Sequence, residues 1–183
     1  MLGADNKHMP DVSPETVPPA VAYITVVSGL PRSGTSLMMQ MLVAGGRKLL
    51  VDERRQPDED NRRGYFEFEP VKNLRQDASW LPQARGKAVK IISQLLFELP
   101  ATETYRIVLM QRNINEVLAS QGAMLARPGH AHSHGDLGNA FIAHLKKLDS
   151  WLAERENISI LHVNYASTIA APLVVANQVN QFL

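Results

Sequence analysis

The sequence contains no cysteine among its 183 residues. The protein therefore has no disulfide, no thiolate nucleophile and no cysteine-ligated zinc site. An excess of charge of one sign is also missing, because 19 lysines and arginines face 18 aspartates and glutamates, which gives a formal net charge of +1. Without a field around the whole molecule we expect no nucleic-acid partner, and any basic site must be local.

A long apolar segment is missing as well. The mainly apolar run at 21–27 is far too short to cross a bilayer, so we expect no membrane partner. Residues 1–20 hold four prolines and no apolar run, so we expect no signal peptide. These features predict a cytoplasmic protein in which residues 1–20 form a mobile tail and residues 21–183 form a single domain. A domain of this size can bury a hydrophobic core.

The most informative stretch that is present is 24–42, ITVVSGLPRSGTSLMMQML. It predicts a buried strand at 24–27, a glycine-containing turn at 28–34 and a helix that begins at Thr35. Such a turn directs several backbone N–H groups to one point, where the helix N-terminus adds roughly half a positive charge. The stretch therefore predicts an anion-binding site in preference to a plain connection between a strand and a helix.

Gly29 and Gly34 have the spacing of the two glycines in the phosphate-binding motif G-x-x-x-x-G-K-[ST]. Thr35, however, occupies the place of the lysine, and Arg32 is the only cation in the turn. The segment 31–36, PRSGTS, closely resembles the loop with which sulfotransferases hold the 5′-phosphosulfate of 3′-phosphoadenosine 5′-phosphosulfate (PAPS). The resemblance implies that PAPS is bound by the residues of this loop: Arg32, Ser33, Gly34, Thr35 and Ser36.

The rest of the chain alternates between strand and helix patterns. Further strands are expected at 48–51, 87–93, 105–111 and 158–163, and helices at 69–75, at 113–127, from 136 onward, and from a cap at Ser167 to the end. Apolar strands separated by helices predict a three-layer α/β/α fold with a mainly parallel sheet, as in P-loop NTPase-like proteins. Ligands bind at the carboxyl ends of such strands, where the loop after the first strand and Arg112 should meet.

Two further elements resemble sulfotransferases. Arg112 at a predicted strand end, with Ser120 eight residues later, is similar to the element that holds the 3′-phosphate of PAPS. The segments 64–67, GYFE, and 87–90, KAVK, look like the middle section of a group of bacterial sulfotransferase-like proteins. The resemblance therefore extends over most of residues 21–183, and it implies the same fold.

The resemblance implies an in-line transfer of a sulfuryl group from PAPS to a hydroxyl or amine of a small-molecule, saccharide or peptide acceptor, with no metal ion. Arg32 would stabilise the leaving phosphate, and Lys90 would be the second cation at the bridging oxygen. Cytosolic sulfotransferases carry a basic histidine where this chain has Ile92. The tyrosylprotein type uses a glutamate after the first helix, so Glu53 is expected to be the base, with Asp52 and Glu67 as alternatives.

Two other functions remain open. In a P-loop kinase or NTPase, Asp52 would hold the metal ion, and in a non-catalytic module the loop would only bind a nucleotide. The histidine triplet His130, His132 and His134 is expected on an exposed loop without further metal ligands. His162 is expected to be a hydrogen-bonded core residue.

Overall fold

The computed structural model describes residues 23–52, 64–125 and 134–183. Within them, four strands form one sheet in the order β2-β1-β3-β4, and every neighbouring pair is parallel. The strands are β1 (Tyr23–Gly29), β2 (Ala88–Lys90), β3 (Thr104–Gln111) and β4 (Ile158–Asn164). Parallel neighbours cannot be joined by a tight hairpin, so the chain crosses over the sheet between them.

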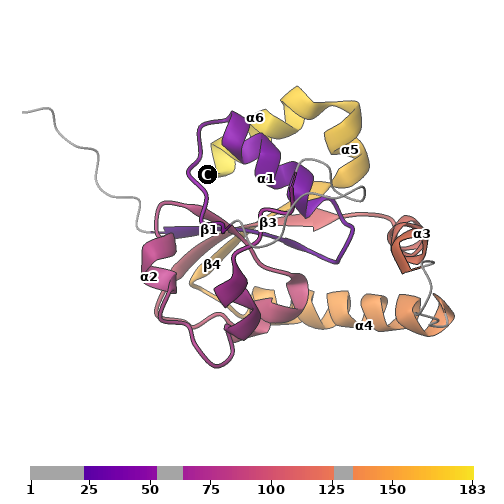
Figure 1. Ribbon diagram of the computed structural model, residues 1–183, viewed down its shortest axis with the longest axis horizontal. Coiled ribbons are helices and arrows are strands. Elements are labelled where there is room, and N and C mark those ends of the chain that lie inside the picture. Colours follow the sequence, from indigo (N-terminus) through magenta and orange to yellow (C-terminus); the bar gives the residue numbers. More distant parts are fainter. Residues whose placement is uncertain (1–22, 53–63, 126–133) are drawn as a thin grey trace, which may run out of the picture.

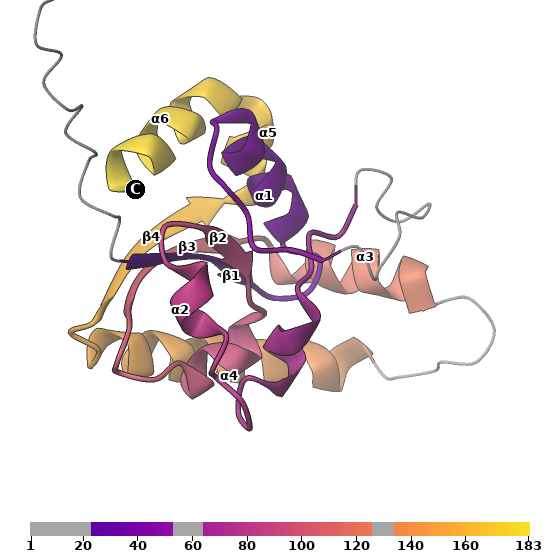
Figure 2. The same ribbon diagram turned by 60° about the vertical axis from the view of Figure 1, so that its left-hand side comes forward.

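Helices cover both faces of this sheet (Figures 1 and 2). One face carries α1 (Thr35–Ala44), α5 (Tyr165–Ala170) and α6 (Pro172–Phe182). The other face carries η1 (Glu69–Asn73), α2 (Leu81–Ala84), η2 (Ser93–Glu98) and α4 (His134–Ala153). Helix α3 (Ile114–Leu125) packs beside α4 beyond the end of the sheet. The predicted three-layer α/β/α fold is confirmed.

Strand β1 supplies side chains to both cores. Ile24 and Val26 are fully buried in the cluster on the α4 face, whereas Val27 belongs to the cluster that contains Met38 and Met39 of α1. Successive strand residues point to opposite faces, so an uninterrupted apolar strand must be covered on both sides. The apolar run at the start of the predicted domain is therefore a central strand, as expected. In the described part of the chain, no helix is both long enough and apolar enough to cross a membrane.

The strand predictions on the β2 edge of the sheet are partly wrong. At 48–51 the chain makes a single bridge, from Leu49 to Ala88, instead of a strand. The strand expected at 87–93 ends at Lys90, because the chain then enters the 3₁₀ helix η2. The predicted helix at 69–75 is likewise only the short 3₁₀ helix η1. Short edge strands and irregular coverage are ordinary ways of protecting the edge of a sheet.

The C-terminal helix also differs from the prediction. Ser167 does not cap it. Instead, the side chain of Asn164 accepts a hydrogen bond from the Ser167 N–H at 3.1 Å and caps the short helix α5. A second helix, α6, then begins at Pro172, which has no N–H to continue the hydrogen-bond ladder from α5.

This break between α5 and α6 changes which apolar residues face the core. The apolar spacing of a single helix from Ser167 onward predicts five core-facing residues: Ile169, Leu173, Ala176, Val179 and Phe182. Of these, Ile169 and Leu173 are 58% and 79% exposed. Val179 of α6 is buried against the α1 side of the sheet, as predicted, and Val175, which was not predicted, is buried there as well. A pattern drawn over one continuous helix is therefore right for the later part of α6 and wrong for Ile169 and Leu173, because the change of direction at Pro172 resets the helical phase.

Tyr105 on β3 makes stability dependent on pH. Its ring is fully buried, and its hydroxyl donates to the Pro100 carbonyl at 3.2 Å. Burial, with a smaller contribution from Glu103, raises the pKa of Tyr105 above its ordinary value of 10.0. Because the folded-state pKa lies above the unfolded one, this contribution to stability is complete below pH 10.0 and declines as the pH rises further. Chemical denaturation between pH 9 and 12 should show this decline, and Tyr105→Phe should flatten it; an unchanged slope in the variant would contradict the assignment.

Candidate functional site

The turn between β1 and α1 has a backbone that glycine makes possible. Gly29 and Gly34 have φ values of 151° and 101°. A Cβ at Gly29 would lie 2.7 Å from the Met110 carbonyl oxygen, and one at Gly34 would lie 2.5 Å from the ring of Tyr165. Both glycines are therefore required by conformation and by space. Between them, Arg32 also lies in the left-handed region, with φ 66°, which is uncommon for a residue with a side chain.

The same turn aims the start of α1 at one point. The Ser33 N–H donates to the Leu30 carbonyl at 3.1 Å and closes the turn, and the Met38 N–H donates to the Gly34 carbonyl at 3.1 Å as the first bond of the helix. The N–H groups that precede Met38 belong to the first turn of the helix, which has no intrahelical acceptors. The start of α1, with the N–H groups of its first turn, thus lies at the carboxyl end of β1, where the sequence predicts an anion site.

A cavity of about 400 Å³ opens at this point, over the carboxyl ends of the strands. It brings together residues from the loop, α1, the 64–67 segment, β2, α3 and α5. Most of the residues predicted for the site line it: Arg32, Gly34, Thr35, Ser36, Glu67, Lys90, Arg112 and Ser120.

Ser33 is an exception among the predicted site residues. Its side chain is 1% exposed, and it lines a separate cavity of about 220 Å³ behind the loop. Its hydroxyl has no hydrogen-bond partner among the residues that the structure describes. The contribution of Ser33 to the loop is therefore its backbone, which closes the turn onto Leu30.

Arg32 connects the loop to the two residues predicted to hold the 3′-phosphate. Its Nε donates to the Ser120 hydroxyl at 3.0 Å, although the two residues are 88 positions apart. Its carbonyl oxygen accepts a hydrogen bond from Nη1 of Arg112, also at 3.0 Å. The side chains of the two predicted subsites therefore form one connected network.

Arg112 is held by two residues that the sequence analysis missed. Its Nε donates to Glu116 Oε2 at 3.0 Å, and its guanidinium lies 4.3 Å from the ring centroid of Tyr165. These contacts fix a planar fork that suits a phosphate. Tyr165 follows β4 directly. Because ligands bind at the carboxyl ends of parallel strands, its position in the sequence could have identified it as a site residue. Glu116 lies four residues after Arg112, a spacing typical of helical ion pairs.

Lys90 forms the opposite wall of the cavity. Its side chain is only 9% exposed, its Nζ donates to the Tyr65 carbonyl, and it lies 3.6 Å from Glu67 Oε1. The Ser36 hydroxyl donates to the same carbonyl at 3.5 Å. A nearly buried ammonium is stable only beside such acceptors, so the 65–67 segment and Lys90 belong together.

The three candidate bases have different positions. Glu53 lies outside the described residues. The N–H of Asp52 donates to the Glu67 carbonyl at 2.9 Å and its carboxylate accepts from the Glu69 N–H at 2.5 Å, which places Asp52 at the start of η1 and not on the cavity wall. Glu67 lines the cavity beside Lys90. Among the described candidates, only Glu67 is therefore in a position to meet a substrate.

Histidines make no comparable cluster in the described residues. His162 is hydrogen-bonded, with Nδ1 2.8 Å from the Gln111 amide nitrogen, but it is exposed, so its prediction as a core residue is wrong. His130 and His132 lie outside the described residues, and of His134 only the backbone is described, at the start of α4. Within the described ranges, no three His, Asp or Glu side chains are close enough to hold a metal ion.

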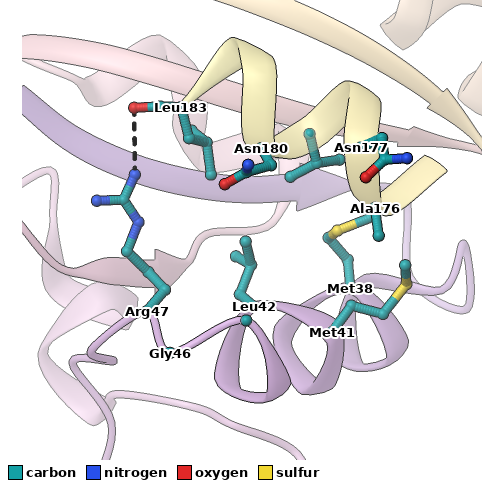
Figure 3. A pocket seen from close by; sticks show the side chains of 11 residues that line it. Met38, Met41, Leu42, Gly46, Arg47, Ala176, Asn177, Asn180 and Leu183 are labelled. Carbon is teal, nitrogen blue, oxygen red and sulfur yellow. Dashed lines mark hydrogen bonds between the residues drawn. The ribbon is translucent and has the colours of Figure 1, made fainter. Parts of the chain in front are cut away.

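A larger cavity, of about 590 Å³, lies away from the loop (Figure 3). It opens between the second half of α1 and α6, over Met38, Met41 and Leu42, with Asn177 and Asn180 of α6 opposite. Among the residues that the structure describes, Arg47 is the only charged one that lines it, and it donates to the Leu183 backbone oxygen at 3.5 Å. The smaller cavity has three cations and a helix N-terminus, so it is the better candidate for binding an anion, although it is smaller.

Comparisons with known proteins give little further information. No family model and no curated protein matches the chain. A sugar kinase from Janibacter sp. HTCC2649, solved without ligand, is similar in structure, with a TM-score of 0.48 and 12% sequence identity over 88% of this chain and 94% of the kinase. An uncharacterized protein from Eubacterium ventriosum has a TM-score of 0.38 and 9% identity over 87% of this chain and 99% of its own. Likenesses of this size carry no argument about function.

Proposed function

We propose that this protein transfers a sulfuryl group from PAPS to a hydroxyl or amine acceptor, in line and without a metal ion. The observation that carries the proposal is the convergence of Arg32, Lys90 and Arg112 on one cavity at the N-terminus of α1. Thr35 stands where a nucleotide triphosphatase has its lysine, so the positive charge of this site comes from side chains outside that position. This distribution of donors suits a ligand with anionic groups at two separate positions.

The donor set fits PAPS in kind. The first turn of α1 and Arg32 would hold the 5′-phosphosulfate, and Arg112 with Ser120 would hold the 3′-phosphate. A sulfuryl group bears less negative charge than a terminal phosphoryl group, so fixed cations and N–H dipoles can stabilise its transfer. Arg32 lies within reach of both subsites, since its side chain donates a hydrogen bond to Ser120 and its carbonyl oxygen accepts one from Arg112.

In the proposed step, the acceptor oxygen or nitrogen forms a bond to sulfur while the bond from sulfur to the 5′-phosphate oxygen breaks. The electron pair of the broken bond stays on that phosphate oxygen, where Arg32 and Lys90 stabilise the developing charge. The acceptor proton passes to a carboxylate, and Glu67 on the cavity wall is the described residue that can accept it. Glu53 stays the alternative predicted from the sequence.

Calorimetric titration tests the cofactor class. Adenosine 3′,5′-bisphosphate is titrated beside adenosine 5′-monophosphate and beside ATP with magnesium. We expect the bisphosphate to bind much more tightly than either of the others, because only it can engage both Arg112 and the loop. Preference for ATP with magnesium would instead place the protein among kinases or NTPases. Bisphosphate binding without sulfuryl transfer from labelled PAPS to any acceptor would favour the non-catalytic module.

Replacing Arg112 by alanine tests the assignment of the 3′-phosphate subsite. The variant should bind adenosine 3′,5′-bisphosphate more weakly by about 1.5 to 3 kcal/mol, the typical contribution of a hydrogen bond to a charged group. Adenosine 5′-monophosphate, which lacks the 3′-phosphate, should bind with nearly unchanged affinity. Glu116→Gln is the matched control, because it removes the ion partner of Arg112 and leaves the guanidinium in place. Equal losses for both nucleotides in Arg112→Ala would contradict the assigned role.

A further inference from the structure

The segment 65–68 passes around the β2 edge of the sheet and is anchored on both of its faces. Phe66 packs against the cluster on the α1 face, which contains Val27 and Met38. Phe68 packs against the cluster on the opposite face, where its ring meets Trp80 edge-on with centroids 5.4 Å apart. Anchors on opposite faces fix the path of the chain between them. That path brings Tyr65 and Glu67 to Lys90, the last residue of β2.

Phe66 has an unusual backbone conformation. Its φ is 53°, in the left-handed region, which is a genuine outlier for a bulky side chain. A residue with a side chain is disfavoured there, because its Cβ lies too close to the following carbonyl oxygen. Such conformations persist where the surroundings over-determine them, and they cluster at functional sites. The question is therefore what the conformation at Phe66 achieves.

The left-handed turn directs two acceptors to the same ammonium group. The carbonyl of Tyr65, before the turn, accepts a hydrogen bond from Lys90 Nζ, and the carboxylate of Glu67, after the turn, lies 3.6 Å from it. The ammonium also lies 5.9 Å from the centroid of the Tyr65 ring. In an extended chain the carbonyl of residue 65 would point sideways, in the hydrogen-bonding direction, while the side chain of residue 67 would stand out of the pleat. The positive φ at Phe66 turns both groups toward one point.

Hydrogen bonds on either side hold this turn in place. The Ser36 hydroxyl, in the first turn of α1, donates to the Tyr65 carbonyl at 3.5 Å. On the other side, the Asp52 N–H donates to the Glu67 carbonyl at 2.9 Å, and the Asp52 carboxylate accepts from the Glu69 N–H at 2.5 Å. The turn is therefore tied to the phosphate-binding loop and to the start of η1. Movement of the turn would change the position of Lys90 relative to the loop.

We propose that the left-handed turn at Phe66 is the positioning element of the Lys90–Glu67 pair. Phe66 touches no substrate: its backbone sets the directions of the Tyr65 carbonyl and the Glu67 carboxylate, and its ring anchors the turn. The use of the pair in sulfuryl transfer depends on the proposed function, whereas the coupling of Phe66 to Lys90 does not. Asp52, which sequence analysis offered as a base, acts in this arrangement as a clamp on the turn.

Three substitutions separate the backbone of Phe66 from its ring. Phe66→Gly and Phe66→Ala both remove the ring, but only glycine adopts a positive φ without strain. Phe66→Leu keeps an apolar side chain together with the unfavourable φ. If the left-handed backbone positions Lys90, the environment of Lys90 in the glycine variant should be closer to that of the wild type than in the alanine variant. This order is expected even though the change to glycine removes more side-chain atoms than the change to alanine.

The first measurement does not depend on activity. Lysine amines are reductively methylated with ¹³C-formaldehyde, and the Lys90 resonance is assigned as the one lost in Lys90→Arg. We expect a separate Lys90 signal in the wild type and in Phe66→Gly, and its merging with the exposed lysines in Phe66→Ala. An unchanged signal in the alanine variant, or an equal displacement in both variants, would overturn the proposal.

The second measurement uses catalysis. Relative to the wild type, kcat for sulfuryl transfer should fall about tenfold in Phe66→Ala and no more than about threefold in Phe66→Gly. The KM for PAPS should change little in both variants. The tenfold effect is roughly the factor by which the left-handed conformation is disfavoured for a residue with a side chain. Equal kcat values for the two variants would contradict the proposal. If both variants are unfolded by circular dichroism, Phe66→Asn and Phe66→Leu replace them, because asparagine tolerates this conformation and leucine does not. A leucine variant that matches the asparagine variant in the Lys90 signal would then overturn the proposal.

The two proposals can fail separately. If the wild type neither binds adenosine 3′,5′-bisphosphate nor transfers a sulfuryl group, the proposed function is wrong. The order of the Lys90 signals in the variants still decides the role of Phe66. If transfer is observed but the glycine and alanine variants behave alike, the proposed function stands and the positioning role of the turn is wrong.

Discussion

Arg32→Ala is expected to slow sulfuryl transfer by about 30-fold to 1,000-fold, which corresponds to about 2 to 4 kcal/mol of transition-state stabilisation. Arg32 is the only cation in the loop, and its side chain is directed by the bond from Nε to the Ser120 hydroxyl at 3.0 Å. A preorganised cation gives most of its effect where charge develops, on the leaving phosphate oxygen. The affinity for PAPS, in which that oxygen is still bonded to sulfur, should therefore change much less than kcat.

Arg32→Lys is the matched control for this prediction. Alanine, lysine and arginine all have a side chain, so the left-handed φ of 66° at this position affects the three proteins alike. Lysine keeps the charge but loses the planar fork, and we expect its kcat between those of the wild type and the alanine variant. Single-turnover rates and calorimetry, measured on the same samples, separate transfer from binding. Equal losses in the transfer rate and in the binding affinity would indicate that Arg32 has a structural role. A lower melting temperature with an unchanged transfer rate would indicate the same.

The second large effect is expected for Gly29→Ala, which should lower the free energy of unfolding by about 2 to 5 kcal/mol. The estimate combines a left-handed penalty of about 1 to 2 kcal/mol with about 1 to 3 kcal/mol for overpacking. The new Cβ would lie 2.7 Å from the Met110 carbonyl oxygen in the neighbouring strand β3, and 2.4 Å from the Ser33 hydroxyl. The serine can rotate away, whereas the backbone of a central strand cannot.

Gly46→Ala provides the comparison for this effect. Gly46 also has a positive φ, 81°, but a Cβ there would meet nothing within 4 Å. Its substitution should therefore lower the free energy of unfolding only by the backbone penalty of about 1 to 2 kcal/mol. Urea denaturation of the two variants measures the difference. Similar losses for Gly29→Ala and Gly46→Ala would mean that β3 and the loop move apart easily, contrary to the contact described.

The sequence predicted the fold because the relevant signals are local. Apolar residues at 24–27 identify a strand that is covered on both faces, and the two glycines with a hydroxyl-rich helix start identify the turn after it. Three of the residues that line the cavity, Arg32, Thr35 and Ser36, could be named for the same reason, since they lie within one short segment. Arg112 could be placed near them because parallel strands end at a common edge.

The boundaries predicted at the C-terminus were wrong for an equally physical reason. The apolar spacing of a single helix led to Ile169 and Leu173 as core residues, but Pro172 starts a new helix and both side chains are exposed. At the other edge, the strand expected at 87–93 ends at Lys90, since the following residues form η2. The β-propensity of a segment does not predict where the sheet ends, because that depends on packing against the neighbouring strands.

What the sequence determined by itself is the layered α/β fold and the glycine turn between β1 and α1, because both follow from periodicity and from glycines at fixed spacing. Only the tertiary structure decided the partners of the charged side chains. Arg32 meets Ser120, and Lys90 meets the Tyr65 carbonyl and Glu67, over separations of 88 and about 25 residues along the chain. Such pairs depend on how distant elements pack and on a left-handed turn at Phe66 that no local pattern predicts, since phenylalanine rarely adopts it.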